Sequence, residues 1–358
     1  MLNQSLQIPE DLKFMSECSI IENPPANLWR PFLSRFEEGN FEQCFEYGEI
    51  AEMAFPRTKA VRLAVSCDGR IVGVVQGAFS SYFGFGMDLG VMHGPIVDTK
   101  SEEGLQFVEA LLKELEGYGK RNRIIHAQVS VSEAWQLQEV FHRMGYTSTG
   151  RSNEYVVNLG KGMDELWKSI THNKRRNIKK ARKEGVEVIQ SRNHEDLLTF
   201  YSMLEAAEKR GGFSSYPLSW FEAVWEIYDP ELSRVFLARW KGEDVSGVFT
   251  VIHGKTVYAL AAGSFRGGWK VRPNDIMHWK IMEWASKNDY SRYQMGIVSE
   301  PPPTEGSSAW GIWRWKREWN GSLERNQIFD KFLSPRYKLI LKAKKLIERS
   351  YSRLGQLR

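Results

Sequence analysis

The chain has 358 residues and a formal net charge of +5, and 42% of its residues are apolar and 26% charged. This composition excludes a collagen-like or disordered chain, and the length leaves room for two domains. No apolar run approaches the ~18 residues of a membrane span, and the N-terminal residues lack a signal-peptide pattern. Cys18, Cys44 and Cys67 form no CxxC pair, which favours a reducing cytosol over a zinc or disulfide framework. We therefore expect a cytoplasmic protein.

The first half of the chain predicts a hairpin, a helix and a further strand. Residues 61–75 (VRLAVSCDGRIVGVV) read as strand, polar glycine-containing turn and strand. Residues 105–119 have the apolar periodicity of a helix, and IIHAQVSV after them reads as a strand. An aromatic-glycine segment at 141–149 closes this half.

A basic helix is predicted over residues 163–184, because Leu166, Ile170, Ile178 and Ala181 can share one side. The stretch 169–185 carries a net charge of +6, which is typical of contact with phosphates, RNA or another polyanion. A solvated helix face is the alternative. The candidate polyanion-binding residues are Lys174, Arg175, Arg176, Lys179, Lys180, Arg182 and Lys183. Two further helices are expected at 194–210 and 217–228.

The second half repeats the element order of the first. At a fixed offset of 174, residues 235–249 share Val, Leu, Ala, Gly and Val with residues 61–75. A helix at 275–288, a strand and the aromatic-glycine segment 315–323 follow. This repetition predicts an α/β (α+β) fold of two tandem units, each a mixed, mostly antiparallel sheet flanked by helices. The expected boundaries are 1–158, 159–324 and a C-terminal segment, 325–358.

The C-terminal segment predicts a basic amphipathic helix over residues 337–354. Apolar residues recur there every three or four positions, and residues 331–358 carry a net charge of +8. We expect this helix either to return to the first unit or to contact an anionic membrane surface.

The motifs of several enzyme classes are missing from the sequence. No GxSxG elbow, no phosphate-binding GxxxxGK[ST] loop and no HxxxH pair occurs, so we expect neither a covalent nucleophile nor a metal site. Chemistry that depends on positioning and electrostatics remains, such as acyl transfer from an activated ester or thioester to an amine.

The duplicated unit resembles the GNAT acyltransferase fold, although neither half has the glycine loop that binds the pyrophosphate of acetyl-CoA. Residues from about 160 to 330 resemble the Fem family of aminoacyl-tRNA-dependent transferases, which add amino acids to peptidoglycan precursors. The similar segments are HNKRRNIKKARKEGVEV (172–188), EAAEKRGGF (205–213), YQMGI (293–297) and GIWRWKREWNG (311–321). Ala207 and Gln294 depart from the family pattern, which has Thr and Asp at these places.

The resemblance implies a cell-wall enzyme that moves an aminoacyl group from charged tRNA to an amine of a nucleotide- or lipid-linked peptide precursor. It implies that Lys316 and Arg210 bind the diphosphate or the adjoining precursor. The further substrate-binding candidates are Phe213, Tyr258 and Trp315. Lys316 has an alternative role as one member of a buried ion pair, and Arg210 as a helix cap.

Two other functions remain open at this point. The first is an acyl-CoA-dependent N-acyltransferase of the GNAT superfamily, with acyl-CoA as the donor in place of aminoacyl-tRNA. The second is a non-catalytic protein that binds RNA or a membrane through its basic segments. Peripheral contact with the inner face of the membrane is compatible with all three functions.

Overall fold

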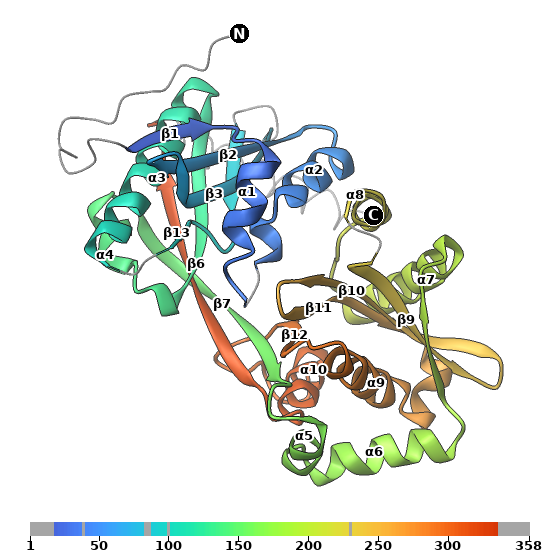
Figure 1. The fold of residues 1–358 in the computed structure, drawn as a ribbon. Helices are drawn as coiled ribbons and strands as arrows, with labels where there is room; N and C mark the ends of the chain where they lie inside the picture. The colour runs from blue at the N-terminus through green and yellow to red at the C-terminus, as the bar shows by residue number, and fades with distance from the viewer. Residues whose placement is uncertain (1–17, 38–39, 82–86, 99–100, 229–230, 336–358) are drawn as a thin grey trace. The chain divides into compact units, whose positions relative to one another are not determined.

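The computed structural model describes residues 18–37, 40–81, 87–98, 101–228 and 231–335 (Figure 1). These residues form two compact units. Unit 1 takes its residues from 1–32, 56–151 and 327–358, and unit 2 comprises 33–55 and 152–326. The predicted helix over 337–354 lies outside the described residues.

Unit 1 is a mixed sheet with a long helix, as the first half of the repeat predicts. The hairpin pairs β2 with β3 antiparallel, whereas β4 and β6 are parallel. The strand order is β1-β2-β3-β4-β6-β13, and β5 pairs with β3. The elements in chain order are β1 (Cys18–Glu22), α1 (Ala26–Leu33), β2 (Thr58–Cys67), β3 (Arg70–Ser81), β4 (Met87–Val91), β5 (Ile96–Val97), α3 (Glu102–Arg121), β6 (Ile124–Ser132), η3 (Glu133–Trp135), α4 (Gln138–Arg143) and β7 (Thr147–Asn158).

The helix α3 shows why this part of the sequence folds as predicted. Ser101 accepts a hydrogen bond from the Gly104 N–H at 3.5 Å, which caps the N-terminus. Acidic residues occupy the first turn and basic residues the last, as the helix dipole favours. One face of α3 is buried against the sheet, including Phe107, Leu111 and Leu115.

Unit 2 repeats this layout. The hairpin β9–β10 and strand β11 are antiparallel, and β11 and β12 are parallel. Its strand order is β7-β12-β11-β10-β9-β8. The elements in chain order are η2 (Phe41–Gln43), α2 (Phe45–Ala54), α5 (Met163–Ser169), α6 (His172–Lys183), β8 (Glu187–Ser191), α7 (His194–Gly211), α8 (Leu218–Ile227), β9 (Ser233–Trp240), β10 (Glu243–His253), β11 (Thr256–Ser264), η4 (Arg266–Val271), α9 (Pro273–Lys287), β12 (Arg292–Ile297), α10 (Ser308–Arg317) and β13 (Ser322–Phe332).

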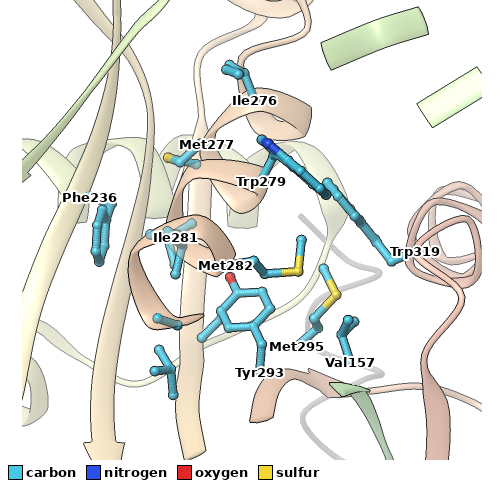
Figure 2. Packing of buried hydrophobic residues seen from close by; sticks show 14 of the residues in the cluster. Val157, Phe236, Ile276, Met277, Trp279, Ile281, Met282, Tyr293, Met295 and Trp319 are labelled. Atoms are coloured by element: carbon cyan, nitrogen blue, oxygen red, sulfur yellow. The ribbon is translucent and has the colours of Figure 1, made fainter. Parts of the chain in front are cut away.

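The core of unit 2 lies where α9 packs on the sheet. Figure 2 shows Met282, Tyr293, Met295 and Trp319 gathered there, and all four are buried. A second buried cluster joins α7 and α8 to the other part of the sheet. Helix α7 approaches β11 so closely that a Cβ on Gly263 would lie 2.3 Å from the backbone nitrogen of Leu204. Only glycine fits at this position.

The structure places two boundaries differently from the sequence prediction. Residues 33–55 belong to unit 2, because α2 packs on α8, where the Ser219 hydroxyl donates to the Ala54 carbonyl at 3.3 Å. The predicted helix over 163–184 is two helices, α5 and α6. The chain is extended at Ile170, and Thr171 caps the second helix by accepting from the Lys174 N–H at 3.2 Å.

Strands β7 and β13 each start in one unit and end in the other. The last part of β7 completes the sheet of unit 2 beside β12, and the last part of β13 completes the sheet of unit 1 beside β6. Residues 325–332, expected at the start of a C-terminal helical segment, are therefore a strand. The tandem architecture of two mixed sheets flanked by helices is as predicted.

A disulfide joins Cys18 and Cys67, which corrects the expectation that the cysteines do not pair. The two residues lie directly opposite each other on the antiparallel strands β1 and β2. Their separation of 49 residues in the sequence has no recognisable spacing, so the pairing follows only from the strand register. Cys44 is a buried thiol.

Candidate functional site

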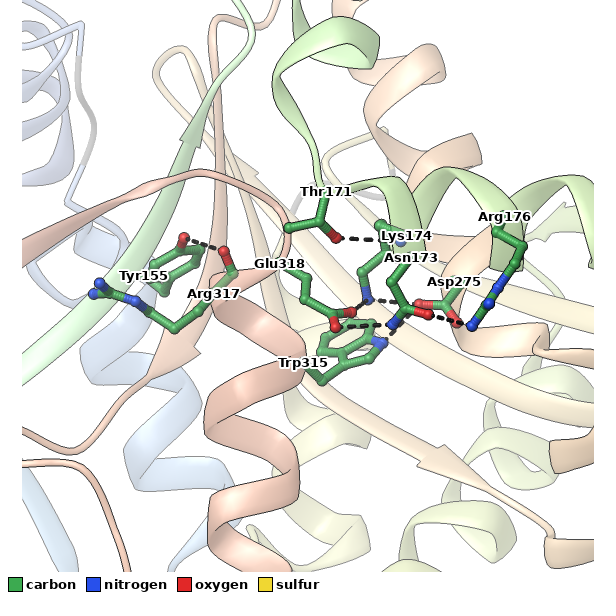
Figure 3. A network of polar contacts seen from close by, with 9 residues as sticks. All are labelled: Tyr155, Thr171, Asn173, Lys174, Arg176, Asp275, Trp315, Arg317 and Glu318. Atoms are coloured by element: carbon green, nitrogen blue, oxygen red, sulfur yellow. Dashed lines mark hydrogen bonds and ion pairs between the residues drawn. The ribbon is translucent and has the colours of Figure 1, made fainter. Parts of the chain in front are cut away.

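Lys174 lies in a buried polar network between α6, α9 and α10 (Figure 3). Its side chain is fully buried, and its Nζ donates to Asp275 Oδ1 at 2.6 Å and lies 3.4 Å from Glu318 Oε2. The rings of Trp315 and Trp319 flank the ammonium at 4.4 and 4.7 Å from their centroids. Burial lowers the pKa of Lys174, although both carboxylates oppose that shift. Lys174 was predicted to bind a polyanion, and the structure assigns it to an internal ion pair instead.

Two further hydrogen bonds complete this network. Trp315 donates from Nε1 to the same Asp275 Oδ1 at 2.8 Å, and Asn173 donates from Nδ2 to Glu318 Oε1 at 2.9 Å. Asp275 stands in the first turn of α9, which Pro273 begins. Trp315, predicted as a substrate-binding residue, is half-buried and fixes the position of α10 on α9.

The remaining basic residues of α6 have two roles: Arg175 caps a neighbouring helix, and the others are exposed to solvent. Arg175 donates from Nη1 to the carbonyls of Trp167 and Lys168 at 3.1 and 2.9 Å, and so caps the C-terminal end of α5. Arg182 donates to Glu283 at 3.2 Å. The exposed basic surface of α6 therefore consists of Arg176, Lys179, Lys180, Arg182 and Lys183.

His278 and Tyr293 form a buried pair beside the Lys174 network, and the sequence analysis did not single out either residue. His278 Nδ1 lies 2.6 Å from the Tyr293 hydroxyl, and its ring is edge-on to Trp315 at 4.8 Å. Burial, together with the charges of Lys174 and Lys316, lowers the pKa of His278 to about 3. This imidazole is therefore neutral at physiological pH. His278 lies one turn after Asp275 on α9. This spacing was the only feature of the sequence that could have pointed to His278 as a neighbour of the Lys174 network.

Lys316 is a half-buried cation without a carboxylate partner among the described residues. It lies on α10, and its Nζ donates to the Ile297 carbonyl at 2.9 Å. Burial lowers the pKa of Lys316 to about 8, although Glu154 attracts the charge from a longer distance. The ion pair considered for Lys316 is thus formed by Lys174, and the Lys316 ammonium retains hydrogen atoms that can bind a ligand.

Gly296 makes the space beside Lys316. Its φ of +74° is a conformation that residues with a side chain rarely adopt, and a Cβ there would lie 3.7 Å from Lys316 Nζ and 3.9 Å from the Ala259 carbonyl. Strand β12 ends at the next residue, Ile297, whose side chain is 67% exposed. The cation is therefore held at the end of β12, next to β11.

Arg210 belongs to a second cationic cluster, at the end of β11. It donates to the carbonyls of Ala206 and Ser264, both at 3.1 Å, and its guanidinium lies 4.8 Å from the Trp269 ring centroid. Burial and the charge of Arg266 lower the pKa of Arg210. The cap role considered for Arg210 is thus realised in its bond to Ala206. The ring beside its guanidinium, Trp269, is 44% exposed, as is the nearby candidate in the sequence, Phe213.

The two cationic clusters are separated along one strand. Ala259 lies next to Gly296 and Lys316, and Ser264 binds Arg210. Five residues of a strand span about 17 Å, so Lys316 and Arg210 cannot share one phosphate. They suit two separate groups of an extended ligand.

Tyr258, the remaining predicted substrate-binding residue, is only 4% exposed. It packs near the ring of Phe41 at a centroid distance of 6.2 Å, within a hydrophobic cluster. Burial raises its pKa well above the usual value. Tyr258 therefore belongs to the core of unit 2 and does not face a ligand.

The described residues provide neither a metal cluster nor a membrane span. No three His, Cys, Asp or Glu side chains within them come together in a way that could hold a metal ion. In the same residues no helix has both the length and the apolarity needed to cross a bilayer.

Comparison with known proteins relates this site to a class of transferases. Residues 168–317 match the model of the acetyltransferase (GNAT) domain. The lipid II:glycine glycyltransferase of Staphylococcus aureus is 23% identical over 395 aligned positions, which cover 87% of this chain and 93% of that protein. The UDP-N-acetylmuramoylpentapeptide-lysine N(6)-alanyltransferase of Weissella viridescens is 22% identical over 57% of this chain and 65% of its own length.

Solved structures agree in fold. The crystal structure of FemX superposes with a TM-score of 0.77 at 18% identity, covering 89% of this chain and 99% of that one. A tandem GNAT protein from the clavulanic acid biosynthesis pathway superposes with a TM-score of 0.58 at 10% identity, covering 89% of this chain and 99% of that one. The fold and the matches together define a transferase built from two tandem GNAT-like units.

Within that class, the chain is similar in sequence to the glycyltransferase and the alanyltransferase named above, and similar in fold to FemX. The match to the GNAT model covers the basic helix α6, the β11–β12 region and α10, and thus contains Lys316, Lys174 and Asp275.

Proposed function

We propose that this enzyme transfers an aminoacyl group from charged tRNA to an amine of a cell-wall peptide precursor. The amine nitrogen attacks the ester carbonyl, the carbonyl–oxygen bond to the ribose breaks, and the proton lost by the amine ends on the ribose oxygen. The activated ester supplies the driving force, so the protein mainly aligns the two substrates. The relatives from S. aureus and W. viridescens, named for glycyl and alanyl transfer, support this proposal.

Lys316 is the observation that carries the proposal. A half-buried ammonium without a carboxylate partner among the described residues is costly unless a ligand anion compensates it. We assign Lys316 to the diphosphate or the adjoining part of the acceptor precursor. Arg210, about 17 Å away along β11, then contacts another part of the same extended molecule, together with the exposed Phe213.

The exposed basic surface of α6 is assigned to the tRNA donor. Its five cations, Arg176, Lys179, Lys180, Arg182 and Lys183, lie on one helix, and only Arg182 of these forms an ion pair among the described residues. Such a surface binds a phosphate backbone with little dependence on sequence. The reaction takes place in the cytoplasm in this proposal, where charged tRNA is available.

The acyl-CoA alternative meets an obstacle at α9. In the GNAT fold the pyrophosphate of the cofactor binds to backbone N–H groups at a helix N-terminus. Here the first turn of α9 contains the carboxylate of Asp275, which Lys174 and Trp315 hold in place. A fixed carboxylate at this end of the helix disfavours a second anion.

A single experiment tests the choice of donor. The enzyme is incubated with a mixture of charged tRNAs, with acyl-CoAs and with precursor extract, and the acceptor is weighed by mass spectrometry. We expect a mass increase of one aminoacyl residue that disappears when the tRNA is digested beforehand. Transfer from acyl-CoA that resists this digestion would overturn the proposal.

A further inference from the structure

Helix α10 presents an unusual apolar surface. Its ten residues, SAWGIWRWKR, include three tryptophans and an isoleucine, yet none of its residues is buried. Trp315 faces Asp275, whereas Trp310 and Trp313 stack on each other with ring centroids 4.9 Å apart, and Ile312 is 50% exposed. A surface helix of a globular domain normally buries its apolar stripe. In α10, Trp313 and Trp315 pack partly buried against the core of unit 2, whereas Ile312 remains largely exposed.

A neighbouring segment extends this surface. Lys316 binds the Ile297 carbonyl, which brings the exposed Ile297 side chain to the last turn of α10. Ile312 precedes Lys316 by four residues, so the two share one face of the helix. Two largely exposed isoleucines thus accompany the lysine that we assign to a phosphate. We call α10 together with Ile297 the α10 surface.

The charge around the α10 surface is positive. The helix contains Arg314, Lys316 and Arg317 and no acidic residue. The guanidinium of Arg317 lies 5.5 Å from the Trp313 ring centroid. Three acidic residues lie near α10 in the sequence. Glu318 accepts a hydrogen bond from Asn173, and Glu300 pairs with Arg325 at 2.9 Å. The third, Glu305, is exposed and precedes the helix.

We propose that the α10 surface docks on the interface of an anionic membrane. Tryptophan beside arginine is the combination that favours the headgroup region, where the rings lie at the boundary and the cations reach lipid phosphates. A short amphipathic helix binds there by apolar burial together with attraction to anionic lipid. The isoleucines favour a membrane over RNA, since aliphatic side chains gain from hydrocarbon but do not stack on bases as rings do.

This inference deepens the proposed function, and its consequence for the acceptor rests on that function. Docking through α10 would bring Lys316 to the level of the headgroup phosphates. A precursor whose diphosphate is anchored to a membrane lipid then meets Lys316 directly. If the enzyme docks in this way, its acceptor is the lipid-linked precursor and not the soluble nucleotide-linked precursor.

The test is binding of the full chain to vesicles made of equal parts phosphatidylcholine and phosphatidylglycerol, compared with phosphatidylcholine alone. We expect binding only to the anionic vesicles, and weaker binding in high salt. The variant Ile297→Ser/Ile312→Ser should reduce the partition coefficient about tenfold or more, because it removes two side chains from the apolar contact. Leu198→Ser is the matched control, since Leu198 is 42% exposed on α7, away from this surface.

A second measurement does not depend on these variants. Brominated lipids should quench the tryptophan fluorescence of the parent chain, and Trp310→Phe/Trp313→Phe should lose most of that quenching. The inference is overturned if the isoleucine variant binds anionic vesicles as well as the parent does, or if Leu198→Ser loses binding equally. It is also overturned if the isoleucine variant binds vesicles normally but loses affinity for tRNA.

The vesicle test needs no transfer reaction, so it can fail while the proposed function stands. Conversely, docking without aminoacyl transfer to any precursor would refute the function alone. A comparison of the two acceptors completes the test. We expect the parent enzyme to prefer the lipid-linked precursor in vesicles over the nucleotide-linked one, and the isoleucine variant to lose that preference.

Discussion

Lys174 and Lys316 are cations of the same kind in different surroundings. The ammonium of Lys174 is enclosed by two carboxylates and two indole rings, whereas Lys316 bonds to a single backbone carbonyl. In the sequence both lie in basic segments, and Lys174 was assigned by the charge of its neighbours, whereas Lys316 was assigned by the family resemblance. The structure separates them by burial, so their substitutions should have different effects.

Replacing Lys174 should destabilise the fold. Lys174→Met leaves the buried Asp275 carboxylate without its cation, and breaking a buried pair on one side costs about 3–5 kcal/mol. Lys179→Met, on the exposed side of the same helix, should change the free energy of unfolding by no more than about 0.5 kcal/mol. Urea denaturation compares the two. Equal stability of both variants would show that the network contributes nothing.

Replacing Lys316 should affect binding and leave stability nearly unchanged. Lys316→Met should weaken precursor binding by about 1.5–3 kcal/mol, the usual value for a hydrogen bond to a charged group, with an almost unaltered melting temperature. Calorimetry and a thermal melt separate this result from a structural role, in which the melting temperature would fall and binding would change only indirectly.

The pKa of Lys316 gives this binding a pH dependence. Its pKa is lowered to about 8, so the ammonium is charged below that pH and loses its proton above it. The affinity of the parent enzyme for the diphosphate should therefore decrease as the pH rises through about 8. Lys316→Met should show no such decrease, and a parallel decrease in both proteins would contradict the assignment.

At the scale of elements, a histidine joins three strands of unit 1. His126 on β6 lies between Asp88 on β4 and Asp330 on β13, with nitrogen–oxygen distances of 2.6 and 3.2 Å, and it stacks on Phe332. Burial opposes protonation, yet the hydrogen bonds and charges of the two aspartates raise the pKa of His126. The protonated form is thus favoured in the folded protein.

This arrangement predicts a stability that decreases as the pH rises. A raised histidine pKa contributes stability that is fully present below the unfolded-state value of about 6.5 and is lost as the pH rises through the folded-state value. The urea concentration at the midpoint of denaturation should therefore decrease as the pH rises above the unfolded-state value of about 6.5, and Asp330→Asn should make that decrease smaller. The exposed His172→Gln is the control, and it should behave as the parent does.

The elements themselves were largely predictable because hydrophobic periodicity and turn residues are local properties. Both hairpins and the helices α3, α7, α8 and α9 lie where the pattern places them. What depends on distant residues was not predictable: the Cys18–Cys67 disulfide, the break at Thr171 and the strand at 325–332. For the site, Lys316 and Arg210 were identified by resemblance. Tyr258 was predicted to bind substrate and Lys174 to bind a polyanion, although both are buried, because burial is not visible in one sequence.

At the scale of the whole molecule, strand β13 contributes residues to both units. Strand β13 starts in unit 2, but its last residues complete the sheet of unit 1 beside β6. Phe329 on this strand is fully buried and stacks on Phe141 of α4 at a ring-centroid distance of 4.3 Å. The stability of unit 1 therefore depends on residues about two hundred positions further along the sequence.

A substitution at Phe329 should consequently destabilise unit 1. Phe329→Ala removes a buried aromatic ring, which costs about 3–5 kcal/mol. Hydrogen exchange should show lost protection in β4 and β6, with α9 and β11 much less affected. Trp319→Ala, at an equally buried position in the core of unit 2, should produce the opposite distribution. If Phe329→Ala reduced protection mainly in unit 2, β13 would stabilise the unit in which it begins and not the one in which it ends.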